Sequence, residues 1–337
     1  MIKEAISQII AGKSLGMTEA SQVMAEIMDG EVTPAQFGAF VTALRLKGET
    51  VEEIAGMAQT MRDKAVHVSI DEPVVDTCGT GGDNSATFNI STTAAFVAAG
   101  AGVKVAKHGN RAMSSQCGSA DVLETLGVKI ELTAEQVQRC LKRVGIGFMF
   151  APSFHPAMKY AAGPRREIGI RTVFNILGPL TNPAGAQAQV LGVADHALVD
   201  KMAKVLRLLG CKHALVVHSE DGLDELTVTG KTFICEVKVN RIHSYSIVPE
   251  EVGLPRGKLK DLKGGTATEN AALLKDILYG KAGHAMNAVI LNAAAVLFVA
   301  ERVATIEEGV QLARESIETG QALSKLNRLI GLTRSFT

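Results

Sequence analysis

The chain of 337 residues contains no tryptophan, and aromatic residues make up only 4% of it. It also lacks an excess of charge of either sign, because 35 lysines and arginines balance 35 aspartates and glutamates. This balance argues against a strongly basic nucleic-acid binder and against a polybasic membrane binder. The scarcity of aromatic side chains favours α/β layers with a core of Ala, Val, Leu and Ile over an aromatic-rich sandwich.

Cysteines with the spacing of a metal site are missing as well. The five cysteines are odd in number and widely spaced, which speaks against a disulfide framework or a structural zinc site. The apolar run over 286–300 is broken by Asn287 and Asn292 and is shorter than the roughly 18 residues that a membrane-spanning helix needs. Because Lys3 and Glu4 replace the apolar region of a signal peptide, we expect a cytoplasmic protein with buried thiols.

What is present divides into two regions. At about 150 residues per domain the length predicts about two domains. Residues 1–70 show helical periodicity only, with Thr33 as an N-cap before Pro34 and a capping box from Thr50 to Glu53. We therefore predict a small all-helical unit at the start of the chain.

After Pro73, short apolar strands alternate with helices. Strands are expected near 74–75, 103–106, 147–150, 189–193 and 214–217, an antiparallel addition near 232–239 and 245–248, and helices over 89–101, 120–126, 133–144, 164–177, 196–209, 269–278, 284–300 and 306–319. This alternation predicts a larger α/β unit with a mostly parallel central sheet flanked by helices. Ligands of such sheets bind beyond the carboxyl ends of the strands.

The first loop of interest is DTCGTGGDNSATFNIST, from 76 to 92. Glycines at 79, 81 and 82 allow backbone N–H groups to approach an anion, and Asn89, Ser91 and Thr92 stand where a helix begins. The loop has neither the GK[ST] of a nucleotide hydrolase nor a GxGxxG fingerprint. We interpret it as a phosphate site, with a tight strand-to-helix turn as the alternative.

The second loop, KHGNRAMSSQCGSAD, runs from 107 to 121. Its cations and hydroxyl groups suit a highly phosphorylated ligand, and Ser119 is predicted to cap the helix that follows. A solvated polar loop is the alternative interpretation.

Two further segments carry charge of opposite sign. GPRREIGIRT, from 163 to 172, contains three arginines, of which Arg165 could hold a carboxylate in a bidentate manner, although surface or phosphate roles are equally compatible with the residues. Asp224 and Glu225 are adjacent acids in EDGLDEL, and hard oxygen ligands beside a phosphate site suggest Mg²⁺. Adjacent acids in a turn are also often merely solvated. His155 follows an expected strand and could line the pocket.

Taken in order, GTGGD, NxST, KHGNRAMSSQCGSAD, GPRREIGIRTVFNILGPLTNP and DGLDE resemble the anthranilate phosphoribosyltransferase family of tryptophan biosynthesis. The resemblance covers most of the chain and rests on five motifs that agree in type, order and approximate separation. It implies that the amine of anthranilate attacks the anomeric carbon of 5-phosphoribosyl 1-pyrophosphate (PRPP) and that pyrophosphate leaves.

The resemblance also implies the site residues. The PRPP contacts would be Gly79, Gly82, Asp83, Thr87, Asn89, Ile90, Ser91, Thr92, Lys107, His108, Gly109, Asn110, Arg111, Ala112, Met113, Ser114, Ser115 and Ser119. The Mg²⁺ ligands, for two ions, would be Ser91, Asp224 and Glu225. The anthranilate contacts would be Gly79, Asn110 and Arg165, with His108, His155 and Pro179 lining the pocket.

The family further implies a homodimer formed through the helical unit. It implies that residues from about 165 to 185 join the helical unit of 1–70, which leaves 71–164 and 186–337 for the α/β unit. From the balanced charge we expect no nucleic-acid or membrane partner. A nucleoside phosphorylase of the same fold is the alternative enzyme, and Arg165 and the acidic pair argue against it. A non-catalytic nucleic-acid-binding paralogue is disfavoured by the balanced charge and the same acidic pair.

Overall fold

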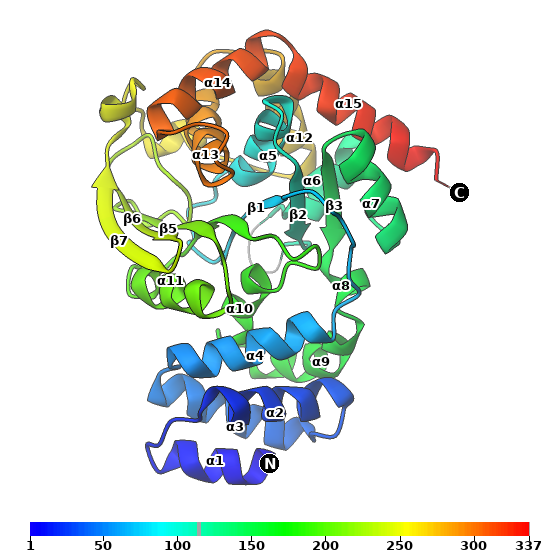
Figure 1. The fold of residues 1–337 in the computed structure, drawn as a ribbon, viewed down its shortest axis with the longest axis vertical. Coiled ribbons are helices and arrows are strands. Elements are labelled where there is room, and N and C mark those ends of the chain that lie inside the picture. Colours follow the sequence, from blue (N-terminus) through cyan, green and yellow to red (C-terminus); the bar gives the residue numbers. More distant parts are fainter. Residues whose placement is uncertain (113–115, 337) are drawn as a thin grey trace.

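The computed structural model describes residues 1–112 and 116–336. Its N-terminal part is a bundle of helices (Figure 1). Its helices are α1 (Ile2–Ile10), α2 (Met17–Asp29), α3 (Pro34–Lys47) and α4 (Val51–Asp63). The two predicted starts are confirmed, because Thr33 Oγ1 accepts a hydrogen bond from Gln36 N and Thr50 Oγ1 accepts one from Glu53 N. Helices α3 and α4 therefore begin where a side chain replaces a missing backbone acceptor.

The α/β unit is built on one sheet of seven strands in the order β3-β2-β1-β4-β5-β6-β7. The strands are β1 (Val75–Gly79), β2 (Val105–Gly109), β3 (Ile146–Phe150), β4 (Ala188–Gly192), β5 (His213–Ser219), β6 (Thr232–Lys238) and β7 (Arg241–Ile247). The first five in chain order pair in parallel, whereas β6 and β7 pair antiparallel. The predicted fold class and the predicted antiparallel addition are both confirmed.

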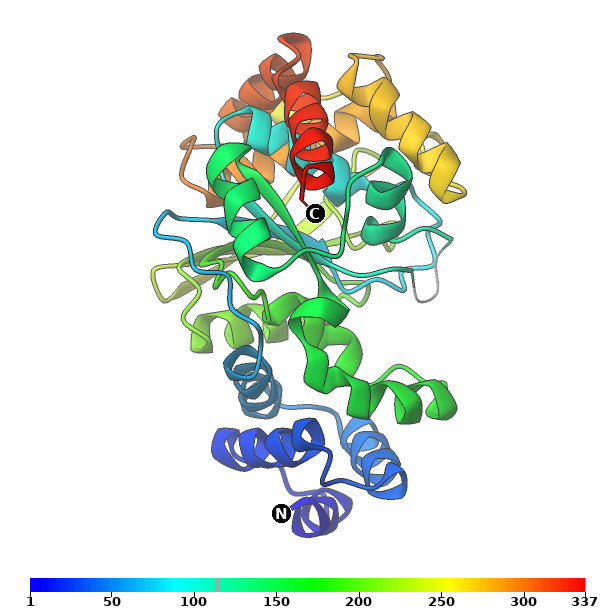
Figure 2. The ribbon, with the colours of Figure 1, turned by 90° about the vertical axis from the view of Figure 1, so that its right-hand side faces the viewer.

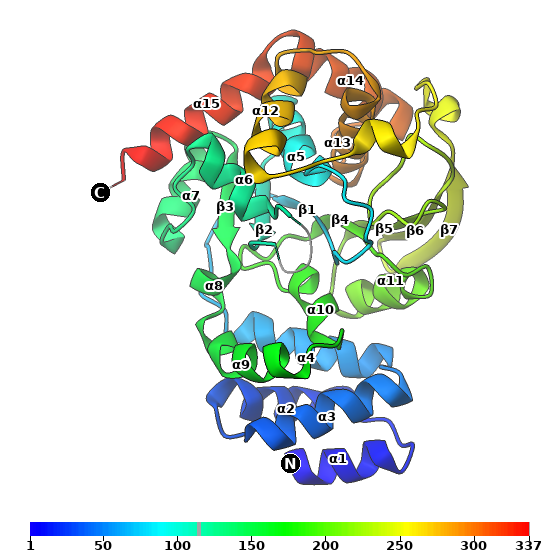
Figure 3. The same ribbon diagram turned by 180° about the vertical axis from the view of Figure 1, so that it is seen from behind.

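Helices cover both faces of the sheet (Figures 2 and 3). The helices that follow the bundle in the chain are α5 (Ile90–Gly100), α6 (Ser119–Leu126), α7 (Ala134–Arg143), α8 (Ala151–Phe154), α9 (Lys159–Ile168), α10 (Phe174–Leu177), α11 (Leu198–Leu208), α12 (Ala267–Leu278), α13 (His284–Val299), α14 (Ile306–Glu318) and α15 (Gln321–Arg334). Of these, α9 packs on the bundle rather than on the sheet. On one face, α5, α13, α14 and α15 form the larger apolar core with the sheet. On the other, α11 and the helical bundle share the second core.

Segments far apart in sequence meet in the second core. Helix α9 packs on α2 and α3, and Phe174 of α10 lies 5.2 Å, centroid to centroid, from Phe37 of α3 (Figure 3). The guanidinium of the largely buried Arg62 on α4 donates to the carbonyl oxygens of Leu180 and Leu209. The bundle is thus attached to the sheet through apolar packing and a few buried polar contacts.

One predicted helix is wrong, and one helix was not predicted. The basic segment 164–177 is not one helix, because α9 ends at Ile168, Gly169 adopts a left-handed φ of 66°, and α10 begins only at Phe174. The last helix was not foreseen either, since α15 follows Gly320 after the predicted end near 319. Its buried residues Ala322, Leu326, Leu329 and Thr333 recur at helical spacing, and this signal was in the sequence.

The cysteines and the apolar helices behave as ordinary interior features. All five cysteines are free, and four of them are buried. Helix α13 is packed on nearly all sides, and within the described residues no helix combines the length and apolarity that crossing a membrane requires.

Candidate active site

The glycine-rich loop lies at the carboxyl edge of the sheet, directly against the acidic pair. Gly79 ends β1 opposite Gly192 of β4, and a Cβ at either glycine would overlap Asp224. The next turn is held by Gly81, whose N–H donates to Asp224 Oδ2 at 2.7 Å. The glycines therefore serve two purposes, because they shape the turn and also admit the acidic loop from β5 to β6.

The second acid of the pair contacts the start of a helix. Ser91 N, in the first turn of α5, donates to Glu225 Oε1 at 3.1 Å. Burial raises the pKa of both carboxyls, and it is reinforced at Asp224 by the charge of Asp83 and at Glu225 by the charge of Asp224. Two half-buried acids that repel each other would be stabilised by a cation bound between them.

The donor set fits Mg²⁺ bound together with substrate phosphates. In the described part of the chain, no three His, Cys, Asp or Glu side chains are grouped as a protein-only metal cage. Mg²⁺ does not need such a cage, because it commonly takes one or two carboxylates and completes its shell with phosphate oxygens and waters. Asp224, Glu225 and the nearby Ser91 supply that kind of half-open oxygen set.

Lys107 brings a buried positive charge to the same edge. Its Nζ donates to Thr77 O at 2.6 Å and lies 3.4 Å from Ser91 Oγ. The fully buried Asp76 accepts hydrogen bonds from the N–H groups of Thr77 and His108. Burial raises the Asp76 pKa, while the charge of Lys107 opposes that rise. Asp76 was missed by the sequence analysis, although an acid inside an apolar strand is itself a signal.

The remaining residues of the first loop are mostly engaged within the protein. Asn89 donates to Cys117 O and accepts from Asn270, so its amide joins the two loops. Asp83 accepts from Ser85, whose hydroxyl also lies 3.3 Å from Thr87 Oγ1. Ile90 and Thr92 are buried, which leaves their backbone at the helix start as the part near the site.

The second loop differs from the prediction at its helix. Ser119 is not the cap, because it is the first residue of α6, and its hydroxyl donates to Asn110 O. Asp121 closes the helix start instead, accepting from the N–H groups of Ala112 and Gly118. A carboxylate three positions after Gly118 reaches these donors, which the hydroxyl of Ser119 does not.

Other predicted phosphate contacts on this loop are already paired or not described. The Arg111 guanidinium forms ion pairs with Asp121 and Glu124. A Cβ at Gly109 would overlap Ser119, which explains the glycine by close approach. Met113, Ser114 and Ser115 lie outside the described residues.

On the other side of the site lies a pair of buried histidines. The rings of His108 and His155 are 5.0 Å apart, and burial lowers the pKa of His108 to about 3 and that of His155 to about 4. Both are therefore neutral at pH 7. His108 Nε2 has no hydrogen-bond partner among the described residues, as expected of a group that meets a ligand. Pro179 lies in the short turn Gly178–Leu180 that directly follows α10.

Arg165 lies on α9, the helix that packs on α2 and α3 of the bundle. It is half-buried on α9, its Cζ lies 5.5 Å from the centroid of the Phe174 ring, and burial lowers its pKa. Within the part of the chain that the structure describes, no acid lies within ion-pair distance of it. A guanidinium beside an aromatic face and without an internal acid is suited to an aromatic carboxylate.

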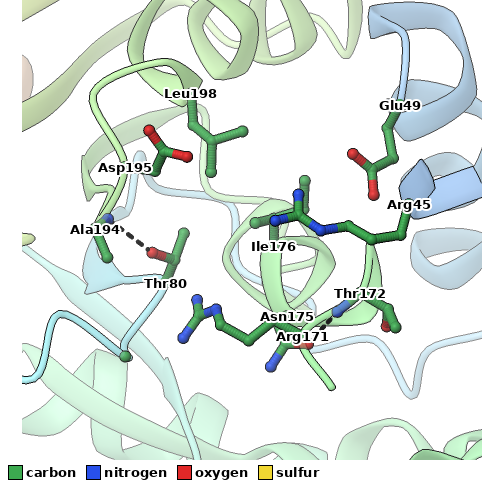
Figure 4. A pocket seen from close by; sticks show the side chains of 11 residues that line it. Arg45, Glu49, Thr80, Arg171, Thr172, Asn175, Ile176, Ala194, Asp195 and Leu198 are labelled. Carbon is green, nitrogen blue, oxygen red and sulfur yellow. Dashed lines mark hydrogen bonds between the residues drawn. The ribbon is translucent and has the colours of Figure 1, made fainter. Parts of the chain in front are cut away.

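A cavity of about 220 Å³ lies between the bundle and the sheet (Figure 4). Arg45 and Glu49 line it from the bundle, and Thr80, Gly82 and Asp195 line it from the sheet side. Arg171 reaches across this region to the glycine loop. The sequence analysis counted this arginine but assigned it no role.

Comparisons with known proteins agree with this geometry. The model described as "Glycosyl transferase family, helical bundle domain" matches residues 3–65, and the one described as "Glycosyl transferase family, a/b domain" matches residues 71–323. The anthranilate phosphoribosyltransferase of Dehalococcoides mccartyi is 58% identical, with 99% of each chain covered, and that of Chloroflexus aurantiacus is also 58% identical, with 99% of each chain covered.

Solved structures give the same answer. The anthranilate phosphoribosyltransferase of Thermus thermophilus has a TM-score of 0.94 and 46% identity over 98% of this chain and 99% of that one. The Saccharomyces cerevisiae enzyme in complex with PRPP and Mg has a TM-score of 0.91 and 28% identity over 99% of this chain and 98% of that one. Family models, full-length relatives and fold thus converge, and the chain belongs to the anthranilate phosphoribosyltransferase family.

Proposed function

We propose that the protein transfers the phosphoribosyl group of PRPP to the amine of anthranilate, giving N-(5-phosphoribosyl)anthranilate and pyrophosphate. The observation that carries the proposal is the acidic pair, which lies against a phosphate-type loop at the carboxyl edge of the sheet. Two further observations support it: His108 and His155 form a neutral pair, and Arg165 on α9 lies on the face of Phe174. The name and ligands of the yeast relative support the same substrates.

The chemistry requires positioning and charge stabilisation more than a strong base. The C–N bond forms as the bond from the anomeric carbon to pyrophosphate breaks, and pyrophosphate takes the electron pair. The nitrogen then gives a proton to pyrophosphate or water. Because the aromatic amine is already neutral, no side chain has to create the nucleophile. Bound Mg²⁺ would neutralise charge on pyrophosphate.

The chain's own residues divide this work. Asp224, Glu225 and Ser91 would hold Mg²⁺, and we propose two ions. The N–H groups of the glycine loop and of the first turn of α5 would bind pyrophosphate, with Lys107 adding positive charge. The other family positions on the first loop, on 107–115 and at Ser119 complete the PRPP site.

Arg165 would hold the carboxylate of anthranilate, with Gly79 and Asn110 as further contacts. His108, His155 and Pro179 would enclose its ring. Because the imidazoles are neutral, the pocket does not add a second cation beside the amine. A nucleobase has no carboxylate for such an arginine to bind, so Arg165 favours anthranilate over a nucleoside as the substrate.

The direct test is a fluorescence assay for anthranilate consumption with PRPP and Mg²⁺. Consumption that requires both additions is the expected result. The comparison tube holds a nucleoside and inorganic phosphate. Turnover there, without turnover of PRPP, would identify a nucleoside phosphorylase instead.

We also propose that the protein is a cytoplasmic homodimer joined through the helical bundle. Ile10 on α1 and Leu46 on α3 support this, because their side chains are 74% and 84% exposed although apolar. Sedimentation analysis of the wild type and of Ile10→Lys plus Leu46→Lys tests it. A dimer unaffected by the two lysines would place the interface elsewhere.

A further inference from the structure

Arg171 contacts the same glycine of the loop as Asp224 of the acidic pair. It lies in the link between α9 and α10, and its Nη2 donates to Gly81 O at 2.9 Å. Gly81 N donates to Asp224 Oδ2 at 2.7 Å. One glycine is therefore held twice, by a metal-site acid through its N–H and by an arginine through its carbonyl.

The neighbouring glycine is shaped around the same guanidinium. A Cβ at Gly82 would overlap Arg171 Nη1, so the arginine lies directly against the backbone there. Gly82 also has a φ of 75°, a left-handed conformation that side chains disfavour. Phosphate binding alone would account for the small loop residues, but not for an arginine packed onto them.

Arg171 also connects the loop to the helical side of the molecule. The link that carries it follows α9, which packs on α2 and α3, and the cavity beside it is lined by Arg45 and Glu49 (Figure 4). Among the described residues Arg171 forms no ion pair, so the Gly81 carbonyl is its one polar contact within hydrogen-bond distance. Its positive charge is felt at Asp224, whose carboxylate it favours against the larger effect of burial.

We propose that Arg171 is a positioning residue that holds the loop of Gly79 to Asp83 in the conformation that binds Mg²⁺ and pyrophosphate. It holds the carbonyl of Gly81, and the N–H of the same residue, on the preceding peptide, donates to Asp224. The inference rests on the proposed function and adds a residue to it. It differs from the role of Arg165, which contacts substrate directly.

A steric double-mutant cycle tests the contact on the protein alone. Gly82→Ala, Arg171→Ala and the double variant are compared by their unfolding midpoints. Gly82→Ala carries backbone strain at φ 75° in both backgrounds, but the new methyl group also displaces the guanidinium, so the additional loss of the Arg171 contact should be seen only where Arg171 is present. Additive losses would show that Arg171 does not rest on the loop and would overturn the proposal.

The functional readout separates positioning from mere stability. Arg171→Gln should weaken the binding of Mg²⁺ with pyrophosphate, measured by calorimetry, and raise the KM for PRPP at least tenfold. The KM for anthranilate should change less than threefold. Arg171→Lys keeps one charged donor for Gly81 O and should recover most of the loss. The matched control is Arg166→Gln, an exposed arginine in the same segment, which should behave as wild type.

Two results would overturn the proposal here. In the first, Arg171→Lys binds pyrophosphate no better than Arg171→Gln. In the second, Arg171→Gln raises the KM for PRPP and the KM for anthranilate equally. If the wild type fails to consume anthranilate with PRPP, the proposed function fails, yet the steric cycle still decides whether Arg171 holds the loop.

Discussion

The two groups of residues in the candidate site differ in charge. On the proposed metal side, burial and mutual repulsion raise the pKa values of the half-buried Asp224 and Glu225, although Lys107 and Arg171 offset part of that rise. On the acceptor side, His108 and His155 are buried and neutral, and Arg165 is a cation on a phenylalanine face. One group is prepared for a cation and the other for an anion, so a pair of unlike ligands is expected to complete both.

The largest effect should come from the acidic pair. Asp224→Asn combined with Glu225→Gln removes the charges that attract Mg²⁺, so kcat/KM should fall at least about 1,000-fold, or about 4 kcal/mol. The dependence of kcat on Mg²⁺, measured by titration, should disappear with it. Glu220→Gln, an exposed acid of the same loop, is the control. An unchanged Mg²⁺ dependence would contradict the metal assignment.

The next effect is a pH dependence of stability on the acceptor side. His155 has a folded pKa of about 4 against an ordinary value of 6.5. As pH falls below 6.5 the unfolded chain binds the proton first, so the folded state loses stability down to about pH 4. Between pH 7 and pH 5 this amounts to about 2 kcal/mol.

Replacing His155 with phenylalanine should reduce that loss by about the same 2 kcal/mol, because the ring remains and the titrating group is gone. Denaturant unfolding at the two pH values measures it. His243→Phe, at an exposed position, is the matched control for the substitution itself. If His155→Phe kept the full wild-type slope, the acid sensitivity would lie elsewhere.

Arg165 should separate the two groups kinetically. Arg165→Gln removes a charge-assisted carboxylate contact of about 1.5–3 kcal/mol, so the KM for anthranilate should rise roughly 10- to 100-fold. The KM for PRPP should stay within about threefold. Initial-rate kinetics with each substrate varied decide it, and equal rises would remove Arg165 from the anthranilate site.

The smallest effect is expected at the buried contact between Asn182 and Asp76. Asn182 Nδ2 donates to Asp76 Oδ2 at 2.7 Å and to Ala106 O at 2.8 Å. Asn182→Ala leaves a buried carboxylate oxygen without that donor and should lower the free energy of unfolding by about 1–3 kcal/mol. Chemical denaturation measures the change, and a neutral substitution would mean that Asp76 finds another donor.

The sequence was most informative where the signal is local. The capping boxes, the alternation of strands and helices and the glycine loop are each written within a few residues, and the structure has them where they were expected. Two predictions were wrong because a local signal favoured another structure. A basic run hid the helix break at Gly169, and a serine at the helix start hid the capping role of Asp121.

The sequence by itself determined the fold class, the family and the order of the motifs, because these depend on residue type and spacing along the chain. Only the tertiary structure decided what each charged residue does. Arg165 and Arg171 are six positions apart and look alike in the sequence, yet one faces an aromatic ring and the other holds Gly81. Asp76 meets Asn182 across more than a hundred residues. Burial and hydrogen-bond partners are properties of packing between distant segments, and no local pattern records them.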